Sequence, residues 1–299
     1  MILFLKPKPP YFFKPFLSLF SFDRPYPEVW DGEVWRRALK LKTGKLVPLK
    51  VQSVGIKNKP KLKVAIQSRA SEGEKQEVRD KLRWIFNTDE DLTELYAFMD
   101  KDPTLRSVKR KLYGLRTFRY PTVFEGVIKS IIQQQIALIA SMYMTNRLVE
   151  KFGDRIKVGE EIFWEFPSPS SLAEASLRQL RSCGLSRGKS NYIKNFSKKV
   201  ASGEFDVESL KRLTGEEIVE KLMELKGIGR WTAELVVVTS TAREALPADD
   251  LGGRRAISNF FFDGNLISGD EARKFTEKWG KFRAMITYYL ICAEHLKSD

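Results

Sequence analysis

The chain has 299 residues, a length that allows two or three domains, and 42% of them are hydrophobic, which is ample for ordinary buried cores. Its net charge of +14 favours a polyanionic partner such as nucleic acid, although 30% charged residues with one histidine also fit a heat-adapted protein. Two cysteines, Cys183 and Cys292, are too few for a disulfide scaffold, a four-thiolate iron–sulfur cluster or a cysteine zinc site. We therefore expect a reduced, cytoplasmic protein.

The first 22 residues are apolar and aromatic, but three lysines and four prolines interrupt them. A membrane span needs about 20 apolar residues in one piece, and a signal peptide needs an unbroken apolar core. We therefore expect no membrane association here, and we predict that residues 1–22 contribute to a protein core.

Short alternating stretches follow, such as Leu49-Lys50-Val51-Gln52 and Leu62-Lys63-Val64-Ala65-Ile66. Turn-forming pairs such as Asp31-Gly32 and Thr43-Gly44 separate them. This period of two predicts an antiparallel sheet with one wet face, within a β-rich domain over residues 1–72.

From residue 73 onward the apolar period becomes helical, beginning with Val78, Leu82, Ile85 and Phe86. We expect helices near 122–133, 137–152, 171–181, 188–202, 207–211, 214–224, 230–240, 253–260 and 269–295, and no further strand. The stretch 153–169 is then the longest irregular connection. The fold class is α+β, divided into residues 1–72, a segment 73–120 that packs with the C-terminal helices, a helical domain 121–245, and a C-terminal helical part 246–299.

One turn between two predicted helices is suited to binding a phosphate. A helix capped by Thr214 and Glu217 leads into Leu225-Lys226-Gly227-Ile228-Gly229, and a second helix begins at Arg230. Two glycines let backbone N–H groups approach a phosphate at a helix start, while Ile228 can fill the core of the hairpin. Tight helix packing is the alternative reading of these glycines.

Several motifs together resemble one family. Residues 225–233 (LKGIGRWTA) and 246–255 (LPADDLGGRR) resemble the hairpin and the Gly/Pro-rich stretch with its catalytic Asp in the HhH-GPD DNA glycosylases. Residues 124–135, 166–169 and 184–189 resemble landmarks of the AlkA-like 3-methyladenine DNA glycosylase II, so the likeness covers roughly residues 115–295. It implies an N-terminal antiparallel β-sheet domain followed by an all-α helix-hairpin-helix core of two helical subdomains.

The resemblance makes Asp250 the catalytic residue. Cleaving a glycosidic bond passes through an oxocarbenium-like sugar, which a carboxylate beside C1′ stabilises. The adjacent Asp249 is a competitor for this role, and a plain helix cap is the alternative for both acids.

At position 231, family members that also cut the strand carry a nucleophilic lysine, whereas this chain has Trp231. The resemblance therefore implies a monofunctional enzyme. Trp231 is also a candidate for stacking on a flipped cationic base, with helix packing as the alternative. Further substrate-pocket candidates on the final helix are Phe282, Arg283 and Tyr288. Core packing is the alternative for the aromatic residues Phe282 and Tyr288, as it is for Tyr289 and Trp279, and Arg283 could bind a phosphate or a flipped base.

The partner that the resemblance implies is double-stranded DNA, bound by a monomer. The expected DNA-binding residues are Gln134, Gln135, Lys226, Gly227, Ile228, Gly229 and Arg230, with Gln135 as the wedge that fills the gap left by a flipped base. The backbone carbonyls of Met223, Leu225 and Gly227 would hold a monovalent cation against a phosphate. We expect no catalytic metal and no organic cofactor.

The function implied is hydrolytic release of alkylated purines of the 3-methyladenine and 7-methylguanine type in base excision repair. Such bases are cationic leaving groups and need no general acid, so the single histidine, His295, is not required. The alternatives are an 8-oxoguanine or hypoxanthine glycosylase of the same fold, and a non-catalytic DNA-binding protein that uses the hairpin as a clamp.

Overall fold

A five-stranded antiparallel sheet forms the N-terminal part of the molecule, as the sequence predicts. The computed structural model describes residues 1–13 and 24–296, and the sheet order is β1-β5-β4-β3-β2. The strands are β1 (Ile2–Leu5), β2 (Val29–Trp30), β3 (Val34–Lys40), β4 (Leu46–Ser53) and β5 (Leu62–Ile66). In β5, Leu62, Val64 and Ile66 are buried and the residues between them are half-buried. One face of the strand therefore lies in the core, as the period of two predicts.

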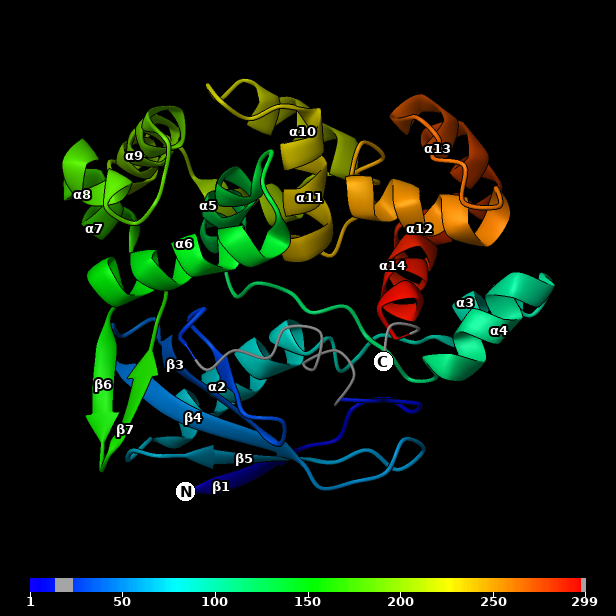
Figure 1. The fold of residues 1–299 in the computed structure, drawn as a ribbon. Helices are drawn as coiled ribbons and strands as arrows, with labels where there is room; N and C mark the ends of the chain where they lie inside the picture. The colour runs from blue at the N-terminus through cyan, green and yellow to red at the C-terminus, as the bar shows by residue number, and fades with distance from the viewer. Residues whose placement is uncertain (14–23, 297–299) are drawn as a thin grey trace.

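Helix α2 (Glu72–Ile85) packs on this sheet (Figure 1). Its apolar stripe shares one core with the strands, together with Leu3, Leu5, Tyr11 and Phe13 of the apolar N-terminal stretch. The remainder of that stretch, residues 14–22, lies outside the described residues. Within the predicted segment 73–120, α2 packs on the sheet, whereas α3 (Thr93–Met99), α4 (Pro103–Lys111) and the residues Leu112 and Leu115 share a core with the C-terminal helices.

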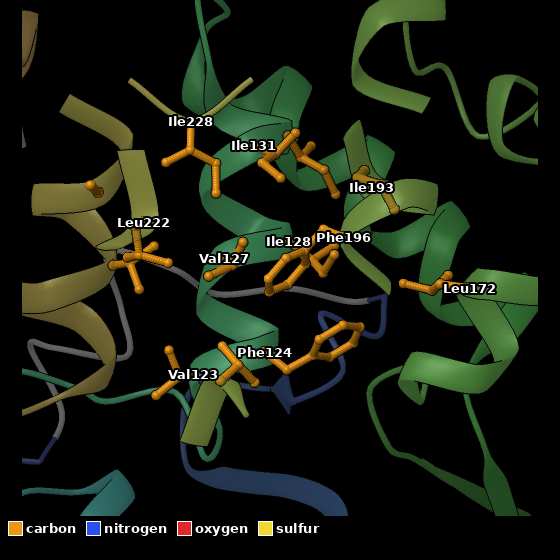
Figure 2. Packing of buried hydrophobic residues seen from close by; sticks show 14 of the residues in the cluster. Val123, Phe124, Val127, Ile128, Ile131, Leu172, Ile193, Phe196, Leu222 and Ile228 are labelled. Carbon is orange, nitrogen blue, oxygen red and sulfur yellow. The ribbon is translucent and has the colours of Figure 1, made fainter. Parts of the chain in front are cut away.

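Helix α5 (Val123–Gln133) is the buried centre of the helical part, since all residues from 123 to 132 are buried. Figure 2 shows Leu222 and Ile228 on one side of α5, and Leu172, Ile193 and Phe196 on the other. The elements around α5 are α6 (Leu138–Phe152), α7 (Pro169–Glu174), α8 (Leu177–Arg181), α9 (Arg187–Ala201), η1 (Val207–Arg212), α10 (Gly215–Met223) and α11 (Arg230–Ser240).

A third core holds the C-terminal helices together with α3 and α4. Its elements are α12 (Leu251–Phe261), α13 (Gly269–Thr276), η2 (Glu277–Phe282) and α14 (Arg283–His295). Two predicted helices are divided: Gly280 with φ +52° interrupts 269–295, and Ser176 begins a new helix with a capping box inside 171–181. Within the described ranges, no helix has the length and apolarity needed to cross a membrane.

The expectation of no strand after residue 73 is wrong. Residues 155–164 form a hairpin of β6 (Arg155–Val158) and β7 (Glu161–Trp164), with Gly159 at φ +59° in its two-residue turn. The hairpin lies beside the N-terminal sheet (Figure 1), where Glu161 pairs with Arg36 of β3 and Lys50 of β4. Four-residue strands give too short an alternation to stand out among helices, so tertiary pairing decides this segment.

Buried charges join the sheet to α5, in a group that we call the ionic seam: Glu28, Arg37, Glu125, Lys129 and Glu165. Arg37 of β3 contacts Glu125 at 2.7 Å, Glu165 at 2.5 Å and Glu28 at 3.1 Å. Lys129, one turn after Glu125 on α5, contacts Glu125 at 2.8 Å and Glu28 at 3.7 Å. The side chains of Arg37 and Lys129 have no exposed area, so the seam fixes how α5 sits on the sheet.

Candidate nucleic-acid interface and active site

The predicted hairpin is present between α10 and α11. Thr214 and Glu217 form the expected capping box, and Ile228 is buried in the helical core, where it points toward α5 (Figure 2). Gly227 has φ +92°, and a Cβ built on it would lie 2.3 Å from ring atoms of Tyr192 on α9. This glycine is therefore required twice, by its left-handed backbone and by the close approach of an aromatic ring.

Gly229 differs from Gly227, although the sequence places both in the same motif. Its φ is −95°, it is exposed, and a Cβ there would meet nothing within 4 Å. The fold does not need a glycine at this position. Its lack of a side chain leaves the N–H groups at the start of α11 open to a ligand, as a phosphate grip requires.

The two basic residues of the hairpin have different surroundings. Lys226 is exposed at the tip. Arg230 is also exposed, but its guanidinium contacts Glu216 at 2.8 Å and Glu234 at 3.1 Å, and Glu234 in turn contacts Arg273 of α13 at 3.0 Å. Arg230 therefore links the hairpin to the C-terminal helices, and these carboxylates balance its charge.

The loop after α5 touches the hairpin directly. The amide of Gln134 donates to the carbonyl of Gly227 at 2.8 Å and to the hydroxyl of Thr232 at 3.0 Å. Gln135 is exposed and has φ +54°, a strained value for a residue other than glycine. We call Gln134, Gln135 and residues 225–230 the hairpin face. The structure thus brings the predicted wedge and the predicted phosphate grip together.

The carbonyls named for a monovalent cation lie along the hairpin. The Leu225 carbonyl accepts from the N–H of Ile228 at 3.1 Å, and the Gly227 carbonyl accepts from Gln134. A carbonyl oxygen has two lone pairs, so these bonds leave the Leu225 and Gly227 carbonyls able to accept a second partner. The cation stays a prediction.

The two acids after the hairpin face different helices. Asp250 is half-buried and caps α12, where its Oδ2 accepts from the N–H of Gly253 at 2.8 Å. Asp249 is exposed, and its Oδ1 would lie 2.0 Å from a Cβ built on Gly269, so this carboxylate packs against the start of α13. The carboxylate at the N-terminus of α12 is stabilised by the helix dipole.

Arg283, a pocket candidate, begins α14, and α14 packs on the start of α12. A Cβ on Gly253 would lie 3.2 Å from the Thr287 methyl of α14, and the Thr287 hydroxyl donates to the Arg283 carbonyl at 2.8 Å. Arg283 therefore lies one helical turn before the residue that touches the α12 start. Trp231 is half-buried in the first turn of α11, outside the three hydrophobic cores of the described residues.

The other aromatic candidates belong to the C-terminal core or pack against it. The Phe282 ring is half-buried with its centroid 5.4 Å from that of Phe98 on α3. Tyr288 is half-buried, and burial beside the Cys292 thiol raises the pKa of its hydroxyl well above the ordinary value. Tyr289 donates to the carbonyl of Leu115 at 2.8 Å within the core, and Trp279 is also buried.

The sequence reading missed the contribution of α9. The ammonium of Lys189 donates to the carbonyls of Ile132 and Gln134, both at 2.7 Å, and Tyr192 packs on Gly227. Lys189 lies within residues 184–189, one of the segments that resemble the family. Its partners could not be predicted, because a hydrogen bond from a lysine to a backbone carbonyl leaves no pattern in the sequence.

The comparisons with known proteins concern the family and the fold of the chain. A family model described as "HhH-GPD superfamily base excision DNA repair protein" matches residues 128–282. A solved 3-methyladenine DNA glycosylase from Archaeoglobus fulgidus is 33% identical and superposes with a TM-score of 0.86 over 97% of both chains. The DNA-3-methyladenine glycosylase of Bacillus subtilis is 31% identical over 206 residues, which is 69% of this chain and 68% of that protein.

A more distant neighbour shares the fold alone. The Clostridium acetobutylicum 8-oxoguanine glycosylase/lyase, solved with double-stranded DNA, is 20% identical with a TM-score of 0.74, covering 100% of this chain and 99% of that one. The same architecture thus occurs with more than one lesion.

Proposed function

Since the chain belongs to the HhH-GPD superfamily of base excision DNA repair proteins, we propose that it is a monofunctional DNA glycosylase for alkylated purines, of the 3-methyladenine and 7-methylguanine type. It would act on double-stranded DNA as a monomer and leave an abasic site. The observation that carries this proposal is the Asp250 carboxylate, held at the start of α12 by the Gly253 N–H.

The proposed reaction needs one carboxylate. DNA bound by the hairpin N–H groups presents a flipped nucleotide, with the base against Trp231 and Arg283 and the sugar beside Asp250. The C1′–N bond breaks and its electron pair leaves with the base, which neutralises the positive charge of the alkylated purine. Asp250 stabilises the oxocarbenium ion and takes the proton of the water whose oxygen bonds to C1′.

Trp231 supports the monofunctional assignment, because an indole cannot attack the sugar as an amine does. The same residue counts against a glycosylase/lyase that acts on 8-oxoguanine. Hypoxanthine is an uncharged leaving group and would require a general acid that this proposal does not include.

The test is base release from duplexes that carry N3- or N7-methylated purines, with strand breaks measured without alkali. We expect free base and intact strands for the wild type. Asp250→Asn should abolish release while it keeps the fold and duplex affinity, because asparagine caps a helix as well as aspartate does.

Asp249→Asn is the matched control and should release base at close to the wild-type rate. Loss of release in Asp249→Asn alone would move the catalytic role by one residue. Turnover retained in Asp250→Asn would refute the assignment, and strand breaks without alkali would refute the monofunctional one.

A further inference from the structure

The hairpin face is held together from a third element, the first two turns of α9. Lys189 there binds the last carbonyls of α5 and its loop, those of Ile132 and Gln134. Tyr192, three residues later and thus on the same side of α9, packs on Gly227 of the hairpin. The loop and the hairpin therefore share one support.

Gln134 closes this arrangement. Its backbone carbonyl accepts from Lys189, while its side chain donates to the Gly227 carbonyl and to the Thr232 hydroxyl, which is buried. Both donor bonds of the side chain are directed into the protein, so Gln134 does not have the free donors that a direct DNA contact requires. The next residue, Gln135, is held at φ +54°. A strained residue persists only where its neighbours are fixed.

We propose that Lys189 and Gln134 are positioning residues that lock the Gln135 wedge to the phosphate-gripping hairpin, so that backbone binding and base extrusion act as one rigid unit. The inference rests on the proposed function and deepens it. It replaces direct DNA contact by Gln134 with a role inside the protein, and it gives Lys189 a role in the reaction without contact to the reacting atoms.

The chain offers a matched control on the same helix. Lys194 of α9 is half-buried like Lys189, and its ammonium also donates to two backbone carbonyls, those of Ala173 at 3.0 Å and Ala175. These carbonyls end α7 and lie outside the hairpin face. Lys194→Met therefore removes the same chemistry as Lys189→Met, but at a different place.

The experiment compares Lys189→Met, Gln134→Met and Lys194→Met in three measurements: affinity for undamaged duplex, fluorescence of 2-aminopurine at the flipped position, and single-turnover base release. For Lys189→Met and Gln134→Met we expect affinity within about threefold of wild type, because neither side chain binds phosphate. The flipping signal should be weaker and release slower by about 10- to 100-fold, since small misplacements cost that much. Lys194→Met should match the wild type in all three.

A second measurement separates positioning from folding. The double variant Lys189→Met/Gln134→Met should release base no more slowly than the worse single variant, because both changes free the same loop. Equal slowing in Lys194→Met would overturn the inference in favour of general stability. Affinity that falls in parallel with release would overturn it in favour of a direct phosphate contact.

Failure of the proposed function gives a different result. If the wild type released no base from any methylated duplex, the proposed function would be wrong, and the 2-aminopurine signal would still test the positioning role of Lys189 and Gln134. If the wild type released base and the two variants did so equally fast, the positioning role would be wrong and the proposed function would be supported.

Discussion

The ionic seam and the hairpin face both end on α5, but they use charge in opposite ways. In the seam, Arg37 and Lys129 are fully buried and each contacts at least two carboxylates. Next to the hairpin face, Lys189 of α9 donates to backbone carbonyls; on the face itself, Lys226 is exposed at the tip and Arg230 pairs with Glu216 and Glu234. The seam cations are neutralised inside the molecule, whereas Lys189 and Lys226 contact no carboxylate among the described residues and keep their charge for a polyanion.

The difference also concerns how each region is fixed. Removing one ion from the seam leaves other charges buried without a partner, so it should lower the stability of the fold. Removing one contact from the hairpin face frees a loop or a turn at the surface, so it should slow base release. The following predictions test this contrast, from the largest expected effect to the smallest.

Arg37→Met should destabilise the fold by about 3–5 kcal/mol, because Glu125, Glu28 and Glu165 then share a buried site with one cation fewer. The measurement is the free energy of unfolding in denaturant. Lys40→Met on the same strand is the control: its pair with Asp154 is 45% exposed on both sides and should cost about 0–1 kcal/mol. Similar losses of unfolding free energy in the two variants would show that the buried contacts of Arg37 stabilise the fold no more than an exposed ion pair does.

Gly227→Ala should destabilise the fold by about 2–4 kcal/mol, because the new methyl group meets the Tyr192 ring at a left-handed φ. Duplex affinity should fall with it. Gly229→Ala should leave the unfolding free energy within about 0.5 kcal/mol of wild type, since its φ is ordinary and its surroundings are open. Any loss of duplex affinity in Gly229→Ala then reports contact with DNA, and unchanged affinity would remove Gly229 from the interface.

Glu28 makes the seam sensitive to pH. Burial raises its pKa against the opposing effects of Lys129 and Arg37, so protonation favours the folded state. This stabilisation is complete below the ordinary carboxyl pKa and is lost as the pH rises through the raised one. As the pH is lowered from neutral toward the ordinary carboxyl pKa, the unfolding free energy of wild type, measured in denaturant at a series of pH values, should therefore rise relative to that of Glu28→Gln.

Glu125 has the opposite shift, since Arg37 and Lys129 outweigh its burial and lower its pKa. Glu125 also acts on Glu28, whose pKa it raises, so the difference between wild type and Glu28→Gln reports Glu28 together with this neighbour. Parallel stability curves for these two proteins would show that Glu28 keeps an ordinary pKa.

The sequence predicted what depends on local pattern. The alternation in β5, the capping box at Thr214 and the burial of Ile228 follow from neighbours in the chain, and the acid at the start of α12 followed from a motif. What it missed depends on distant partners. An ion pair between Arg36 and Glu161, which are more than 100 residues apart in sequence, joins the β6–β7 hairpin to the sheet. In the seam, Arg37 and Glu125 are 88 residues apart in sequence.

The motif itself did not separate its two glycines. Position 227 needs glycine because Tyr192 lies on it, and Tyr192 belongs to another helix. Likewise, Gln134 looked like a DNA contact because it adjoins the wedge, whereas its partners Gly227 and Thr232 are nearly 100 residues away. Side-chain contacts between separate helices are decided by packing and not by spacing.

The smallest effect concerns the Tyr288 hydroxyl, which is buried beside the weakly polar Cys292 thiol and has no oxygen or nitrogen partner among the described residues. Tyr288→Phe keeps the ring and removes this group, so it should leave the stability unchanged or raise it by up to about 1 kcal/mol, and base release should stay within about twofold. Tyr289→Phe is the control, because it removes the bond to the Leu115 carbonyl and should cost about 1–3 kcal/mol. A marked loss of base release in Tyr288→Phe would show that the hydroxyl contacts the flipped base, which would extend the pocket beyond Trp231 and Arg283 to the buried side of α14.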